Sequence, residues 1–218
     1  MKEKNMPSNK FFATNSDKRL HRWGFKDSGF ELIEEKSVTF SGNRYEVSGT
    51  VMPDFIPYIE SVLGIDFNKE DQIEPVDSKP TQPPNIDQAF LESLKASFDE
   101  DRYTLDDMER LIHSHGQETF KDVYKVLYNA IDRTVDLVFY PESESEVKKI
   151  VDLAVRFNIC LIPYGGGTNV TRALTIPENE NRTVVSIDMR RMSKIEWINK
   201  EDRRVCVQSG ITGGELIE

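Results

Sequence analysis

Apolar and polar positions alternate near the start of the chain and then take up a helical period. Residues 1–20 are polar and aperiodic, which predicts a disordered start. Residues 37–40 and 45–47 alternate on either side of a polar turn, which predicts a small hairpin. Residues 55–63 repeat apolar side chains at three and four positions and Gly64 follows, so a short amphipathic helix is expected there.

Residues 68–85 separate this region from a second helical pattern. They carry four prolines among acids and amides and have almost nothing to bury, so we predict a linker. Helical spacing returns over residues 86–132 and is clearest over residues 120–131. We therefore predict one amino-terminal region, residues 21–132, made of the hairpin, the linker and a helical lead-in.

Residues 133–218 show the pattern of alternating strands and helices. Apolar strands are predicted at residues 135–140 and 159–164, with a helix between them that starts at a capping box of Ser143 and Glu146. A strand, a helix and a strand within about thirty residues predict a right-handed βαβ unit. We therefore expect the two strands to be parallel and adjacent.

Three further elements follow in the same segment. A strand is predicted at residues 183–187, a hairpin at residues 194–207, and a helix after a second capping box formed by Thr212 and Glu215. The chain ends one turn into that helix, and a helix so short has little stability of its own. We therefore expect an α+β fold in which residues 133–218 are the first part of an incomplete domain.

The sharpest motif is a glycine-rich loop at the end of the second of these apolar strands. It consists of Pro163, Tyr164, Gly165, Gly166, Gly167, Thr168 and Asn169. Consecutive glycines can adopt positive φ angles and present successive backbone N–H groups, which makes a concave anion site. The spacings of the dinucleotide fingerprint and of the phosphate-binding P-loop do not occur here. The loop therefore predicts an anion site that uses its own amides, with a plain flexible turn as the alternative.

Composition narrows the class of partner. The net charge of the 218-residue chain is −10, which argues against nucleic acid because no basic stripe is present. No apolar stretch reaches the length of a membrane span, and peripheral membrane contact is left open. Cys160 and Cys206 lie in apolar runs without the spacing of metal ligands, so we expect reduced thiols and no metal site.

The loop and its surroundings resemble the FAD-binding flavoproteins of the vanillyl-alcohol oxidase type. Their loop has the pattern P-x-G-G-G-[TS], and residues 136–141, 145–158 and 207–212 extend the likeness. The resemblance implies the first α/β lobe of a PCMH-type FAD-binding domain. It also implies that residues 163–169 bind the pyrophosphate of FAD. Tyr164 and Asn169 depart from the residues that are usual in that family.

Segments outside the predicted FAD domain resemble the alkylglycerone-phosphate synthase family within that group. They are residues 22–30, 44–49 and 53–64, and residues 113–116 lie at a similar His-Gly pair. The resemblance implies exchange of the acyl chain of acyl-dihydroxyacetone phosphate (1-acyl-glycerone 3-phosphate) for a long-chain fatty alcohol in ether-lipid synthesis, with FAD but without net redox. It also implies a peroxisomal location. Neither the carboxyl-terminal Ser-Lys-Leu signal nor the amino-terminal R-L-x5-[HQ]-L signal of that family occurs in this sequence.

Some assignments stay open in the sequence. No catalytic residue is assigned, because the tyrosine and histidine cluster of the family has no counterpart here. His113 and His115 are interpreted as surface residues at a helix end. The alternative functions are an FAD-dependent 2-hydroxy-acid dehydrogenase or oxidase of the same fold and an inactive truncated fragment. A homodimer is neither predicted nor excluded.

Overall fold

The computed structural model describes residues 25–68, 82–116 and 119–217. The chain forms two compact units, residues 1–76 and 77–218, and each is described by itself. The predicted disordered start and most of the predicted linker lie outside the described residues. Residues 77–132, which the sequence pattern grouped with the hairpin, belong to the same unit as residues 133–218.

The first unit holds a three-stranded antiparallel sheet and one helix. The strands are β1 (Gly29–Leu32), β2 (Val38–Ser41) and β3 (Val51–Met52), in the order β1-β2-β3, and α1 (Phe55–Leu63) follows them. The helix ends at Gly64 in the left-handed conformation (φ 65°), as predicted. The strand predicted at residues 45–47 is wrong, because this segment forms turns and β2 pairs with β1 and β3. Gly49 (φ 81°) closes these turns, and its N–H donates to Phe40 O at 2.8 Å.

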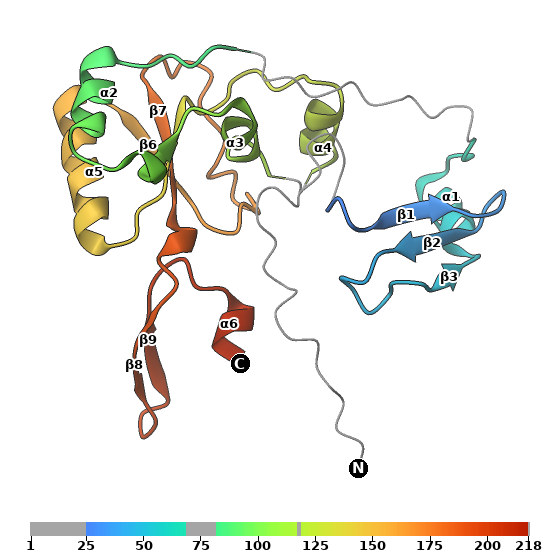
Figure 1. Ribbon diagram of the computed structural model, residues 1–218. Helices are drawn as coiled ribbons and strands as arrows, with labels where there is room; N and C mark the ends of the chain where they lie inside the picture. Colours follow the sequence, from blue (N-terminus) through green and yellow to red (C-terminus); the bar gives the residue numbers. More distant parts are fainter. Residues whose placement is uncertain (1–24, 69–81, 117–118, 218) are drawn as a thin grey trace. The chain divides into compact units, whose positions relative to one another are not determined.

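A four-stranded sheet in the order β4-β5-β7-β6 forms the centre of the second unit (Figure 1). Its strands are β4 (Tyr103–Thr104), β5 (Leu137–Phe139), β6 (Cys160–Tyr164) and β7 (Val184–Asp188). β5, β7 and β6 are parallel, and β4 is an antiparallel edge strand. The predicted parallel direction of β5 and β6 is confirmed, but their predicted adjacency is wrong because β7 lies between them. All five residues of β7 are buried, which suits the centre of a sheet and not its edge.

Helix α5 (Glu144–Phe157) connects β5 to β6 and has the predicted ends. Ser143 Oγ accepts a hydrogen bond from Glu146 N–H at 3.3 Å, and Asn158 closes the helix in the left-handed conformation (φ 54°). Helix α2 (Gln88–Lys95) lies beside α5 (Figure 1). The two helices and the sheet bury one apolar cluster, formed by Phe90, Leu94, Leu137, Phe139, Ile150, Ala154, Ile159, Val185 and Ile187.

A second apolar cluster also involves the sheet. It is formed by Val135, Val138, Ile162, Tyr164, Leu174, Ile176 and Val184. The other helices that precede β8 in the second unit are α3 (Asp107–Ile112), α4 (Phe120–Leu127) and the short 3-10 turns η3 (Glu100–Arg102) and η4 (Met189–Arg191). Arg110 anchors α3, because its fully buried guanidinium donates to Val135 O at 2.8 Å and to Thr134 Oγ1 at 3.1 Å. The anchor holds α3 against the segment that leads into β5.

A hairpin and a short helix follow the sheet. β8 (Ile195–Asn199) pairs antiparallel with β9 (Arg204–Val207), and α6 (Gly213–Ile217) comes after them. Thr212 N–H donates to Glu215 Oε2 at 2.6 Å and Glu215 N–H donates to Thr212 Oγ1 at 3.4 Å, so the predicted capping box is confirmed. Within the described ranges, no helix is long and apolar enough to cross a membrane.

Candidate functional site

The glycine loop follows β6 at the carboxyl ends of the parallel strands, which is the edge where ligands usually bind. Six of the seven predicted residues, all except Tyr164, line an open hollow of about 230 Å³. A Cβ placed on Gly165 would meet no atom within 4 Å. The described chain therefore leaves room for a ligand directly above the loop.

The backbone of the loop is arranged to present N–H groups. Within the described part of the chain, the N–H groups of Gly166 and Gly167 donate to no other residue. Gly167 (φ 70°) and Asn169 (φ 61°) both lie in the left-handed region. Asn169 Oδ1 accepts a hydrogen bond from Leu174 N–H at 2.9 Å, which fixes the turn after the loop. The loop thus fits an anion such as the pyrophosphate of FAD through backbone amides.

Tyr164 supports the loop from the core. Its side chain is 1% exposed and belongs to the second apolar cluster. A Cβ on Gly167 would overlap Tyr164 Oη, so the phenol lies directly against the loop backbone. Burial raises the pKa of Tyr164 to about 12, and its hydroxyl is therefore neutral at physiological pH.

His113 lies in the core beside the loop, and its interpretation as a surface residue is wrong. It is fully buried at the carboxyl end of α3. Its Nε2 lies 2.8 Å from Asp188 Oδ2, and its ring centroid lies 4.2 Å from that of Tyr164. His115 is half-buried. A signal for His113 was present in the sequence, because an acid that ends an apolar buried strand, as Asp188 does, requires a polar or cationic partner.

Asp188 is the centre of a buried polar cluster that His113, Arg190, Tyr140 and Glu109 complete. Arg190 Nε donates to both Asp188 carboxylate oxygens, at 2.9 and 3.0 Å. Burial acts to raise the pKa of Asp188, but the hydrogen bonds from His113 and Arg190 outweigh it and lower this pKa to about 2. Tyr140 Oη donates to Glu109 Oε2 at 2.9 Å, and burial together with that carboxylate raises the pKa of Tyr140 well above its ordinary value.

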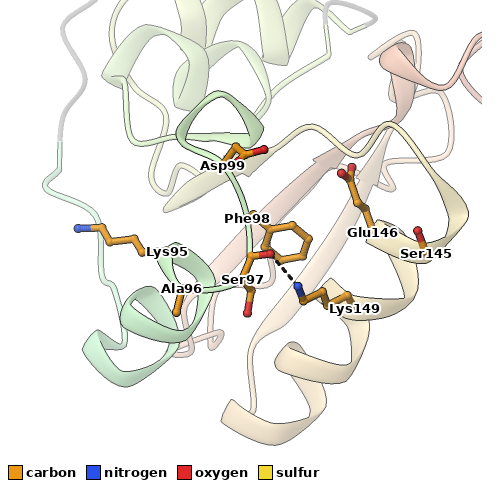
Figure 2. A pocket seen from close by; sticks show the side chains of 8 residues that line it. All are labelled: Lys95, Ala96, Ser97, Phe98, Asp99, Ser145, Glu146 and Lys149. Carbon is orange, nitrogen blue, oxygen red and sulfur yellow. Dashed lines mark hydrogen bonds between the residues drawn. The ribbon is translucent and has the colours of Figure 1, made fainter.

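A larger hollow, of about 410 Å³, lies between the end of α2 and the start of α5. Figure 2 shows Lys149 reaching across it from α5, where its Nζ donates to Ser97 O at 2.7 Å. The same Nζ lies 5.0 Å from the centroid of the Phe98 ring. Glu146 accepts a hydrogen bond from Glu142 N–H at 2.7 Å, so it completes the helix cap. These contacts hold two helices together and give no sign of a ligand.

Comparisons with known proteins agree with this geometry. Residues 135–218 match the family model of an FAD binding domain. Alkyldihydroxyacetonephosphate synthase of Caenorhabditis elegans is 38% identical over 198 residues, which are 89% of this chain and 32% of that protein. The enzyme of the same name from Dictyostelium discoideum is 34% identical over 188 residues, which are 83% of this chain and 30% of that protein. A solved structure of alkyldihydroxyacetonephosphate synthase has a TM-score of 0.78 and 29% identity, covering 93% of this chain and 38% of the other.

A second class of relative matches a shorter part of the chain. Mitochondrial D-lactate dehydrogenase (cytochrome) of Arabidopsis thaliana is 32% identical over 119 residues, which are 55% of this chain and 19% of that protein. The chain spans about a third of the length of the alkyldihydroxyacetonephosphate synthases that it matches. FAD is the cofactor of the matched domain. Residues 135–218 therefore form part of an FAD binding domain, and the chain is similar over most of its length to the amino-acid sequences and fold of alkyldihydroxyacetonephosphate synthases.

Proposed function

We propose that this chain supplies the loop that binds the FAD pyrophosphate in an alkylglycerone-phosphate synthase, the enzyme also called alkyldihydroxyacetonephosphate synthase. One observation carries the proposal. The match to the Caenorhabditis elegans enzyme runs over 198 residues, which is more than the second compact unit, residues 77–218, can hold. The likeness therefore includes part of the first unit, which lies outside the FAD domain.

The proposed reaction exchanges the acyl chain of 1-acyl-glycerone 3-phosphate for a long-chain fatty alcohol in ether-lipid synthesis. Bound FAD supplies the reactive flavin, and the reaction involves no net oxidation or reduction. The task of this chain is to bind and orient the cofactor. The substrates and a peroxisomal location follow from the same resemblance.

In this proposal, each predicted loop residue has a role that its position supports. The N–H groups of residues 165–167 hold the pyrophosphate, and Thr168 lines the same hollow. Pro163 places the chain at the end of β6, and Asn169 fixes the turn that follows. Tyr164 lies beneath the loop and acts through it.

The alternative function is an FAD-dependent dehydrogenase of 2-hydroxy acids. The similarity to D-lactate dehydrogenase favours it, but that match is short enough to lie within the second unit. Such an enzyme needs the same FAD loop, so cofactor binding does not separate the two proposals. The substrate does separate them.

Two experiments test the proposal in turn. The first measures FAD binding by the 218-residue chain through quenching of flavin fluorescence, with Gly166→Val as the test variant. A side chain at Gly166 makes only an ordinary 3.8 Å contact within the protein, so Val there should preserve the fold and cover the amides. Gly213→Val is the control, because its Cβ would also meet open space but lies outside the loop. Equal FAD affinity of the two variants would contradict the assignment of the loop.

The second experiment tests the reaction. The chain replaces the matching segment of the Caenorhabditis elegans enzyme, and the hybrid is loaded with FAD. We expect it to exchange the acyl group of acyl-dihydroxyacetone phosphate for labelled hexadecanol and not to oxidise D-lactate. Oxidation of D-lactate without exchange would replace the proposed function by the alternative.

A further inference from the structure

The buried polar cluster beside the loop contains a histidine whose two ring nitrogens both face acceptors. His113 Nδ1 lies 2.7 Å from Glu109 O, a backbone carbonyl that can only accept a hydrogen bond. His113 Nε2 lies 2.8 Å from Asp188 Oδ2, which belongs to a carboxylate and also accepts. A ring that donates to both of these acceptors carries a proton on each nitrogen, as only an imidazolium does.

The surroundings of this ring balance its charge. Asp188 pairs with it at the end of β7, and Glu109 Oε2 on α3 lies 3.7 Å from its Nδ1. Arg190 shares the Asp188 carboxylate from η4. Tyr140 and Tyr164 face the ring with neutral phenols, at centroid distances of 6.1 and 4.2 Å. Two cations thus face two anions around the fully buried pair of His113 and Asp188, an arrangement in which removing one partner is costly.

The segment from His113 to Gly116, at the carboxyl end of α3, contacts the glycine loop at two points. Through its ring, His113 packs on Tyr164, which lies against the backbone of Gly167. Three residues later, Gly116 lies so close to the far end of the loop that a Cβ there would be 2.6 Å from Thr168 O. The carboxyl end of α3 is therefore joined to the sheet through Asp188 and braces the loop from behind.

We infer that His113 is a positioning residue, an imidazolium whose bond to Asp188 holds the glycine loop in the shape that binds the cofactor. The inference rests on the proposed role of the loop. It assigns to a segment outside the matched FAD binding domain, residues 135–218, a part in building the cofactor site. His113 acts through Tyr164 and Gly116 and does not itself line the hollow.

Two readouts on the 218-residue chain test the inference without any turnover. The first is long-range ¹H–¹⁵N correlation of the histidine rings, with the His113 signals assigned by their loss in His113→Gln. We expect both ring nitrogens of His113 to carry a proton in the folded chain. The second is amide hydrogen exchange of Arg172 and Leu174, whose N–H groups donate to Asn169 O at 2.8 Å and to Asn169 Oδ1 at 2.9 Å at the end of the loop. We expect His113→Gln to accelerate it about tenfold or more, the effect of losing one buried charged hydrogen bond.

A matched pair of variants separates loop support from general stability. Asp188→Asn and Asp136→Asn are the same change at opposite ends of β7, since Asp136 Oδ2 accepts from Val184 N–H at 2.8 Å at the start of that strand. Both acids are fully buried and paired with an arginine. We expect Asp188→Asn to accelerate exchange of the Arg172 and Leu174 amides and Asp136→Asn to leave their relative protection unchanged.

The outcomes are distinguishable from those of the proposed function. A His113 ring with a single proton at pH 7, or equal loop exchange in the two aspartate variants, overturns the inference. If the variants do not fold, the ring protonation of the unaltered chain still decides it. A chain that shows the doubly protonated ring and the protected loop, but does not bind FAD, supports the positioning role and rejects the proposed function.

Discussion

Gly116→Ala adds one methyl group behind the glycine loop, at a point where the protein has no room for it. The new Cβ would overlap Asn169 Cβ and lie 2.6 Å from Thr168 O, and a backbone oxygen cannot move aside as the end of a flexible side chain can. Overpacking of this kind costs about 1–3 kcal/mol. For a chain of this size, each kcal/mol lowers Tm by about 2–4 °C, so we expect a loss of about 2–12 °C.

The comparison variant is Gly165→Ala, on the ligand side of the same loop. Its Cβ would meet no atom within 4 Å, so we expect a change in stability of no more than about 0.5 kcal/mol. Both variants should weaken FAD binding, measured by flavin fluorescence, but only Gly116→Ala should also lower Tm in a thermal melt without FAD. An unchanged Tm for Gly116→Ala would refute the close packing of the His113 segment on the loop.

Three further outcomes are expected. Because the pKa of Asp188 is lowered from 3.8 to about 2, its ionised form contributes about 2 kcal/mol of stability, which is fully present above pH 4 and is lost as the pH falls towards 2. Urea unfolding at pH 6 and pH 3 should show part of this loss in the unaltered chain, and the fall in stability should be smaller in Asp188→Asn. Ser143→Ala should cost about 1 kcal/mol by removing the cap of α5, whereas Ser145→Ala should not, and chemical denaturation measures both. The Tyr164 hydroxyl should stay protonated up to pH 11. Ionisation of Tyr164 below pH 11, followed by tyrosinate absorbance at 295 nm, would contradict its burial.

Local signals predicted much of the second unit. The helix of residues 144–157 begins at a serine cap and ends at an asparagine, and both signals lie within the helix and its first neighbours. The turn between β8 and β9 is equally local, because Asn199 Oδ1 accepts from Asp202 N–H at 3.0 Å. The loop of residues 163–169 was predicted for the same reason, since its glycines are consecutive.

The errors came from features that depend on distant partners. The strand predicted at residues 45–47 alternates correctly, but β2 finds its partners in β1 and β3. The adjacency of β5 and β6 was inferred from the crossover alone, and a right-handed crossover leaves room for a strand that arrives later in the chain. β7 fills that place because all of its residues must be buried.

The sequence by itself determined helices α1, α5 and α6, the parallel direction of β5 and β6, and a glycine loop at the carboxyl end of a strand. These depend on caps, periodicity and consecutive glycines, whose energetics act over a few residues. Only the tertiary structure decided that β7 enters the middle of the sheet and that His113, Tyr164 and Asp188 meet beneath the loop. A buried charge can be tolerated only where a partner of opposite charge is brought to it, and here the partners come from segments 75 residues apart, a distance that no local pattern spans.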